Sequence, residues 1–184
     1  IQNIRSLAFS PADLDGLNEG KYVIRSSGSN AERWDLETGT ITTYTGHTSE
    51  ISAVAYAQKG KTIFTGSKDG TIKIWNAASG KEVATMVAIG AADWAVTSPS
   101  GLFDASPGAM KLLHFTAGLE IIGFDQLKVR YYEPGLLQKL LGFIKYDVRN
   151  VSDIGVLELY PEIDAKIDGD SLRIKLSIRS GGLG

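Results

Sequence analysis

The 184-residue chain contains no cysteine, which excludes disulfides, thiolate metal sites and cysteine nucleophiles within it. No run approaches the ~18 consecutive apolar residues that a membrane-spanning helix requires. The formal net charge is −2, and no stripe of lysine and arginine suggests a surface for nucleic acid. The absence of cysteine fits a cytoplasmic protein, and a hydrophobic fraction of 43% is ordinary for a globular one.

The chain also lacks an initiator methionine and a signal peptide. It begins at Ile1, directly in a pattern typical of a strand. We therefore expect the sequence to be an internal piece of a longer protein.

The most informative stretch runs from Thr45 to Trp75 and contains three short segments of alternating apolar and polar residues. These segments are 51–56, 62–67 and 71–75. Between the last two lies Lys68-Asp69-Gly70, where glycine can supply the positive φ of a tight hairpin turn. Three short strands separated by turn residues predict an antiparallel meander.

This stretch resembles one repeat of the WD-repeat family of β-propellers. The resemblance rests on Gly46-His47, on the Asp69-Gly70 turn, and on Trp75-Asn76, where the family usually has Trp-Asp. In that family a His, a Ser or Thr, an Asp and a Trp form a buried hydrogen-bonded tetrad. The resemblance implies this role for four residues: His47, Thr65, Asp69 and Trp75. Each of these polar groups is costly to bury alone, but together they can satisfy one another's hydrogen bonds. The alternative interpretation of the His–Asp pair, as a catalytic acid and base, lacks a nucleophile.

Residues 4–44 repeat the pattern, with one residue deleted at a turn. Trp34 aligns with Trp75, and Trp34-Asp35 keeps the family's dipeptide. The turn of this unit lacks Asp-Gly, and its histidine position would precede Ile1, so the resemblance does not supply a full tetrad here. We expect blades at about 1–46 and 47–86.

Beyond residue 86 the repeat decays, although residues 92–97, 101–104 and 110–115 still suggest strands. We expect a degenerate third blade over 87–123. The fold class predicted for residues 1–123 is a mainly β, partial WD-repeat β-propeller, because a closed ring needs ~4–8 blades. The outer face of the first blade would then be bare, and its apolar side chains there include Leu7, Phe9, Val23 and Trp34.

From Phe124 the apolar spacing becomes helical, and Gly142 supplies a stop signal. We expect a helical cap or linker over 124–152. Asp168-Gly169 then predicts a hairpin between two alternating segments. These strands resemble the start of a small β-sandwich, so a truncated β-sandwich-like segment is expected over 153–184.

A second, looser resemblance is to bacterial proteins that join a WD-repeat propeller to a caspase-like peptidase domain. It is carried by Asp93-Trp94, by Gly101-Leu-Phe-Asp104, by Ser106-Pro107 and by Arg130-Tyr-Tyr-Glu-Pro-Gly-Leu-Leu137. It implies a multidomain protein in which a peptidase domain follows this chain.

No catalytic, cofactor or metal site is predicted. The aspartates around Gly169 suggest a calcium loop, but Lys166 and Lys175 would fall at positions that need acidic ligands. Residues 66–70 contain Gly and Lys, but they lie between strands, whereas a phosphate loop needs a helix N-terminus. His114 has no companions that complete a metal set.

We therefore predict a non-catalytic scaffold that binds protein partners through the propeller face and loops, without a cofactor, nucleic acid or membrane. Rigid sheets that hold short loops suit binding and supply no chemistry by themselves. The alternative is a regulatory or sensor segment of a caspase-like peptidase whose catalytic domain lies beyond the C-terminus. A third possibility, a structural tether, applies to residues 124–152. A downstream His–Cys pair favours the peptidase context, and further WD repeats favour the scaffold.

Overall fold

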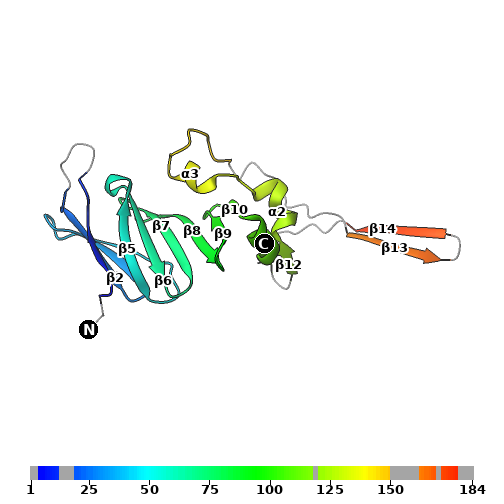
Figure 1. The fold of residues 1–184 in the computed structure, drawn as a ribbon, viewed down its shortest axis with the longest axis horizontal. Coiled ribbons are helices and arrows are strands. Elements are labelled where there is room, and N and C mark those ends of the chain that lie inside the picture. Colours follow the sequence, from blue (N-terminus) through cyan, green and yellow to red (C-terminus); the bar gives the residue numbers. More distant parts are fainter. Residues whose placement is uncertain (1–3, 13–18, 118–119, 150–161, 169–170, 178–184) are drawn as a thin grey trace.

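The structure is a computed structural model that describes residues 4–12, 19–117, 120–149, 162–168 and 171–177. Two antiparallel sheets lie side by side and dominate the fold, with a few short helices beside the second sheet (Figure 1). The two sheets do not close into a ring. None of the helices in these ranges is long and apolar enough to cross a membrane.

The first sheet is a four-stranded meander in the order β1-β2-β3-β4. Its strands are β1 (Leu7–Phe9), β2 (Tyr22–Ser27), β3 (Asn30–Asp35) and β4 (Ile41–Tyr44). The register places Val23 opposite both Phe9 and Trp34. Consecutive strands are neighbours throughout, as alternating segments joined by short turns predict.

The second sheet has six strands in the order β5 to β10. They are β5 (Ile51–Ala57), β6 (Thr62–Ser67), β7 (Thr71–Asn76), β8 (Glu82–Ile89), β9 (Asp93–Thr97) and β10 (Phe103–Ala105), and the 3₁₀ turn η1 (Gln58–Gly60) joins the first two. The strands β9 and β10, expected within a third blade, extend this sheet, because β9 pairs with β8 and β10 pairs with β9. Residues 51–105 thus form one continuous sheet where the sequence suggested parts of two blades.

The prediction of a strand over residues 110–115 is wrong for residues 110–112. These residues belong to a helix, α1 (Pro107–Leu112), and the chain returns to a strand only at β11 (His114–Ala117). The side chain of Ser106 accepts a hydrogen bond from the Ala109 N–H at 3.2 Å, and Pro107 occupies the first helical position. A serine cap followed by proline is a helix-start signal that outweighs the strand-like apolar run.

A shared apolar core joins the two sheets. Ile51 and Val54 of β5 are buried against Ile24 and Ala31 of the first sheet. The Ile51 N–H also donates to the Gly28 carbonyl at 2.8 Å, across the sheet boundary. Because β5 uses its inner face to cover the first sheet, the two sheets stack as neighbouring repeat units do.

The remaining elements follow the second sheet. They are β12 (Glu120–Gly123), α2 (Phe124–Tyr131), α3 (Leu136–Leu140), β13 (Glu162–Asp168) and β14 (Ser171–Ser177). Leu136 of α3 is fully buried against Ile74 and Val96 of the sheet, while Leu127 of α2 packs with Phe103. The strands β13 and β14 pair as a hairpin, but its turn and the residues 150–161 before it lie outside the described residues. The sandwich-like segment and the domain boundaries stay predictions.

Candidate functional site

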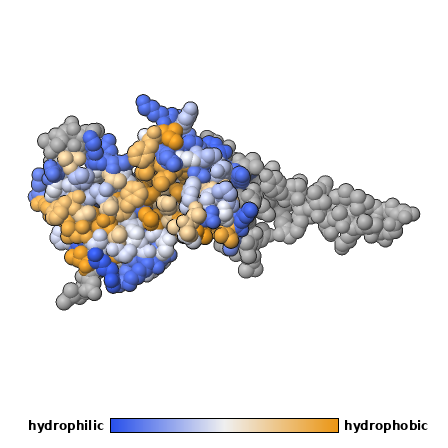
Figure 2. Space-filling view, in the orientation of Figure 1, coloured by the Kyte–Doolittle hydropathy of each residue, from blue (hydrophilic) through white to orange (hydrophobic). Residues whose placement is uncertain are grey.

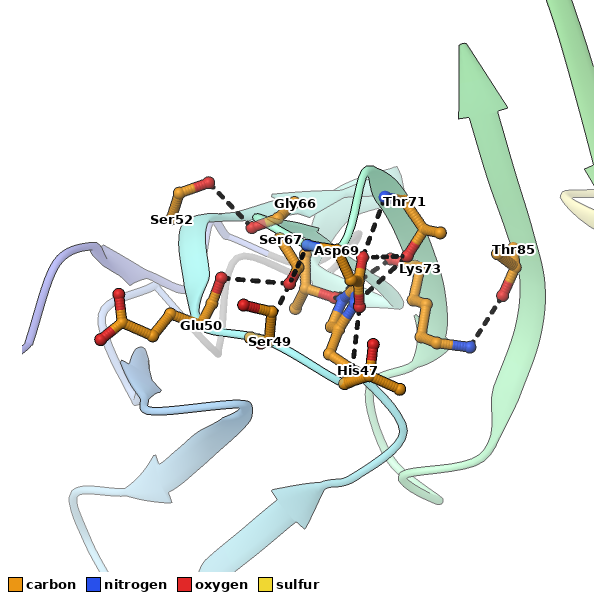
Figure 3. Close-up of polar contacts among 12 residues, drawn as sticks. His47, Ser49, Glu50, Ser52, Gly66, Ser67, Asp69, Thr71, Lys73 and Thr85 are labelled. Carbon is orange, nitrogen blue, oxygen red and sulfur yellow. Dashed lines mark hydrogen bonds and ion pairs between the residues drawn. The ribbon is translucent and has the colours of Figure 1, made fainter. Parts of the chain in front are cut away.

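Four polar side chains predicted from the repeat pattern come together inside the second sheet. His47 precedes β5, Thr65 lies in β6, Asp69 lies in the β6–β7 turn, and Trp75 lies in β7. The Thr65 hydroxyl lies 2.8 Å from both His47 Nε2 and Trp75 Nε1. On the other side of the imidazole, Nδ1 lies 2.8 Å from the Asp69 carboxylate (Figure 3). A continuous chain of hydrogen bonds therefore links the turn to the interior of the sheet.

The partners fix where the protons lie. The Asp69 carboxylate can only accept, so His47 Nδ1 carries a hydrogen and donates to it. The Trp75 indole can only donate, so it gives its N–H to the Thr65 oxygen. In a neutral imidazole, Nε2 then accepts the hydrogen of the Thr65 hydroxyl, whose oxygen also lies 3.4 Å from the Lys73 carbonyl oxygen.

The inner part of the network is shielded from solvent, whereas the Asp69 side chain at its outer end is 9% exposed. Thr65 is 0% and Trp75 2% exposed, and the side chain of His47 is 0% exposed. Gly46 makes this packing possible, because a Cβ there would lie 3.3 Å from the Trp75 ring and the φ of 151° disfavours other residues. A group that solvent and solutes do not reach cannot exchange protons with a substrate, so the geometry speaks against the acid/base alternative.

Asp69 also organises the turn at the end of the sheet. Its two oxygens accept hydrogen bonds from the hydroxyl and N–H of Thr71, at 2.7 and 2.9 Å, and from the Thr48 N–H at 3.0 Å. Burial opposes the charge of this carboxyl, but these hydrogen bonds and the one from His47 outweigh burial and lower its pKa. Gly70 follows with φ 85°, the left-handed conformation that the turn requires.

Sequence reasoning missed a second polar group beside this network. Lys73 Nζ lies 2.9 Å from the Thr85 hydroxyl (Figure 3). It also lies 2.8 Å from a Glu82 carboxylate oxygen, so it ties β7 to β8. Both charged residues are visible in the sequence, but the register that places Lys73 opposite Thr85 and close to Glu82 is not.

The first sheet holds the remaining signature residues in a different arrangement. The Trp34 indole donates to a Glu32 carboxylate oxygen at 3.2 Å instead of entering a buried network. Asp35 accepts hydrogen bonds from the backbone N–H groups of Glu37 and Thr38 in the next turn. Asn76, its counterpart after Trp75, does the same for Ala78 and Ser79. Asn can therefore replace the family's Asp here, because either side chain forms this turn.

No group of three or more metal-ligating side chains converges in the part of the chain that the structure describes. The four residues of the network hydrogen-bond to one another. The arrangement is suited to holding strands together and leaves the loops to face solvent.

Comparison with known proteins agrees with this geometry. A family model described as "WD domain, G-beta repeat" (WD40) matches residues 39–76, the span from just before β4 to the end of β7. The target of rapamycin complex subunit wat1 of Schizosaccharomyces pombe is 30% identical over 59 residues. That match covers 30% of this chain and 19% of the other protein, so the chain spans about a fifth of its relative. Residues 39–76 therefore form a WD40 repeat, within a fold that is a partial WD-repeat β-propeller.

Proposed function

We propose that this protein is a non-catalytic scaffold for protein–protein interaction. The observation that carries the proposal is the WD40 repeat at residues 39–76, whose interior holds a largely buried hydrogen-bonded network and whose loops remain exposed. WD40 repeats generally mediate protein interactions and are not catalytic. The fission yeast relative is named as a subunit of a complex, which supports the same class of function.

The proposed role of His47, Thr65, Asp69 and Trp75 is structural. They fix the β6–β7 turn to the interior of the sheet, so the loops at that end keep one shape. Binding loops on a preorganised frame lose less conformational entropy when a partner docks. We propose that partners contact the loops and the exposed propeller face.

The whole protein is proposed to continue beyond this chain. The chain would be the C-terminal part of a propeller in a larger multidomain protein of the cytoplasm. The narrower hypothesis, a bacterial protein in which this segment regulates a caspase-like peptidase, predicts a His–Cys pair in the same polypeptide. Its looser residue pattern makes it the second candidate.

The scaffold proposal is tested by purifying the chain with its partners from its own cells and mapping the contact by hydrogen exchange. We expect a stoichiometric protein complex in which the partner protects loop amides, such as those of residues 46–50 or 67–70, more than strand amides. Multiple-turnover conversion of a substrate, abolished by one point change in this chain, would contradict the proposal. The absence of any stoichiometric partner would also contradict it.

A further inference from the structure

A pocket of about 350 Å³ opens at the boundary between the two sheets. Its wall is built from segments that are distant in sequence, and it includes Ser10, Pro11, Tyr22, Arg33, Lys59 and Lys61. The volume is near the lower end of the ~300–1,000 Å³ usual for ligand pockets. It suits a few side chains of a partner better than a large cofactor.

Arg33 is held in one position in this wall. Its guanidinium carbon lies 3.7 Å from the centre of the Tyr22 ring, and Nη1 donates to the Ala77 carbonyl of the second sheet. The Tyr44 hydroxyl donates to the same carbonyl at 2.7 Å. Stacking and a hydrogen bond together orient the planar donor group, as in sites that recognise carboxylates.

The turn that carries Lys59 is also held in place. Gln58 and Lys59 have φ values of 50° and 54°, which are uncommon for residues other than glycine. The Gln58 side chain accepts a hydrogen bond from the Thr62 hydroxyl at 2.6 Å and donates to the Leu141 carbonyl. The strained turn is thus fixed by the body of the protein, and it places Lys59 in the pocket wall.

The pocket has an excess of positive charge. Within the described ranges no carboxylate forms an ion pair with Arg33, Lys59 or Lys61; Asp35 lies with Arg33 in the wall of a neighbouring pocket but does not pair with it. Two phenols that feel the charge of Arg33 do not compensate it, because burial raises the pKa of Tyr56 to about 12 and also raises the pKa of Tyr44. A half-buried guanidinium without an ion-pair partner is costly, and an anion in the pocket would lower that cost.

We propose that this pocket binds an acidic segment of a protein partner, with a carboxylate at Arg33, Lys59 and Lys61. Pro11 and the Tyr22 ring supply apolar walls for the stem of the acidic side chain. The site rests on the proposed scaffold function and deepens it, because it names the chemistry that a partner must present.

The test is a titration of the whole chain with fluorescently labelled hexaglutamate peptide, followed by anisotropy at low and at high salt. K59Q/K61Q removes two exposed charges without touching the core, and K111Q/K145Q removes two exposed charges elsewhere. We expect K59Q/K61Q to weaken binding about tenfold, as two charge contacts of ordinary strength allow, and the matched control to change it less than about twofold. R33Q should weaken binding at least as much, and R33K only partly restores it because lysine lacks the planar fork.

Several outcomes would overturn the proposal. Equal weakening by the two double variants would mean that only net charge matters. Equal binding of hexaglutamine would mean that carboxylates are not recognised. Tighter binding of a single-stranded oligonucleotide of equal charge, lost in K59Q/K61Q, would assign the pocket to nucleic acid instead. These results leave the scaffold test intact, because a partner could still protect the loops at the opposite end of the sheets.

Discussion

Replacing Thr65 by valine removes one hydroxyl from the centre of the buried network while nearly keeping the shape of the side chain. The change leaves the Trp75 indole N–H and His47 Nε2 without the partner that each has at 2.8 Å. A buried donor or acceptor left unsatisfied costs about 1–3 kcal/mol, so the two together predict a loss of about 2–6 kcal/mol. That is a large part of the roughly 5–15 kcal/mol that holds a domain folded.

The assay is urea denaturation followed by tryptophan fluorescence. Thr65→Val should lower the midpoint on the order of 1 M or more, given slopes of about 1–3 kcal/mol per molar. Thr65→Ser keeps the hydroxyl and loses only a methyl group, so it should cost about 1 kcal/mol. Thr43→Val, an exposed threonine on β4, is the matched control and should change stability by less than about 0.5 kcal/mol. If Thr65→Val and Thr43→Val behave alike, the hydroxyl does not bridge the two rings.

The remaining predictions concern charge and exposed surface. Because the pKa of Asp69 is lowered in the folded protein, its charge stabilises the fold above the unfolded pKa of about 4 and loses this effect as pH falls further. The stability difference between wild type and Asp69→Asn should therefore shrink below about pH 4, and a difference that stays constant to pH 2 would contradict this. Glu133, 4% exposed, binds Lys139 and Arg149. Glu133→Gln should therefore speed tryptic cleavage at Arg149, and an unchanged rate would show that the ion pairs do not hold this segment. Leu7 and Phe9 are 51% and 60% exposed on β1, and hydrophobic residues gather over the sheets in Figure 2. We expect concentration-dependent self-association in size-exclusion chromatography that Leu7→Glu/Phe9→Glu reduces, whereas a monodisperse wild-type monomer would refute the exposed interface.

A comparison of β5 with the segment around β1 explains why the exposed surface at Leu7 and Phe9 is expected to self-associate. Ile51 and Val54 are 1% and 8% exposed because β5 packs on the first sheet, whereas Ile4 and Leu7 hold similar places in the preceding repeat and are about half exposed. A face of the same composition is thus covered in one repeat and open in the other.

Local signals in the sequence were sufficient to predict the meander formed by β5, β6 and β7. The Asp69-Gly70 turn and strict alternation determine these strands, and the spacing of typed residues from Gly46 to Trp75 indicates which side chains meet. The structure agrees because the contacts involved are between neighbouring strands.

Other features of the fold depend on packing between residues distant in the chain, so they could not be predicted from local sequence patterns. The residues Met110-Lys-Leu112 fit a strand as well as a helix, and the local signal for a helix is the Ser106 cap followed by Pro107. The pairing of β9 onto β8 buries Val96 against Leu136, some forty positions later in the chain, a contact that no local pattern specifies. The pocket around Arg33 was missed for the same reason, since its wall combines turns from both sheets.

The structural role of the buried network is tested most directly by solvent exchange of the tryptophan indole N–H groups, followed by nuclear magnetic resonance. The chain has 3 tryptophans, so each signal can be assigned by single Trp→Phe changes. Trp75 is 2% exposed and donates to Thr65, whereas Trp34 is only half-buried and donates to Glu32 near the surface. We predict that the Trp75 N–H exchanges at least tenfold more slowly than that of Trp34, as a group that exchanges only when the sheet opens should. Equal exchange of the two would contradict the claim that the network holds this repeat together.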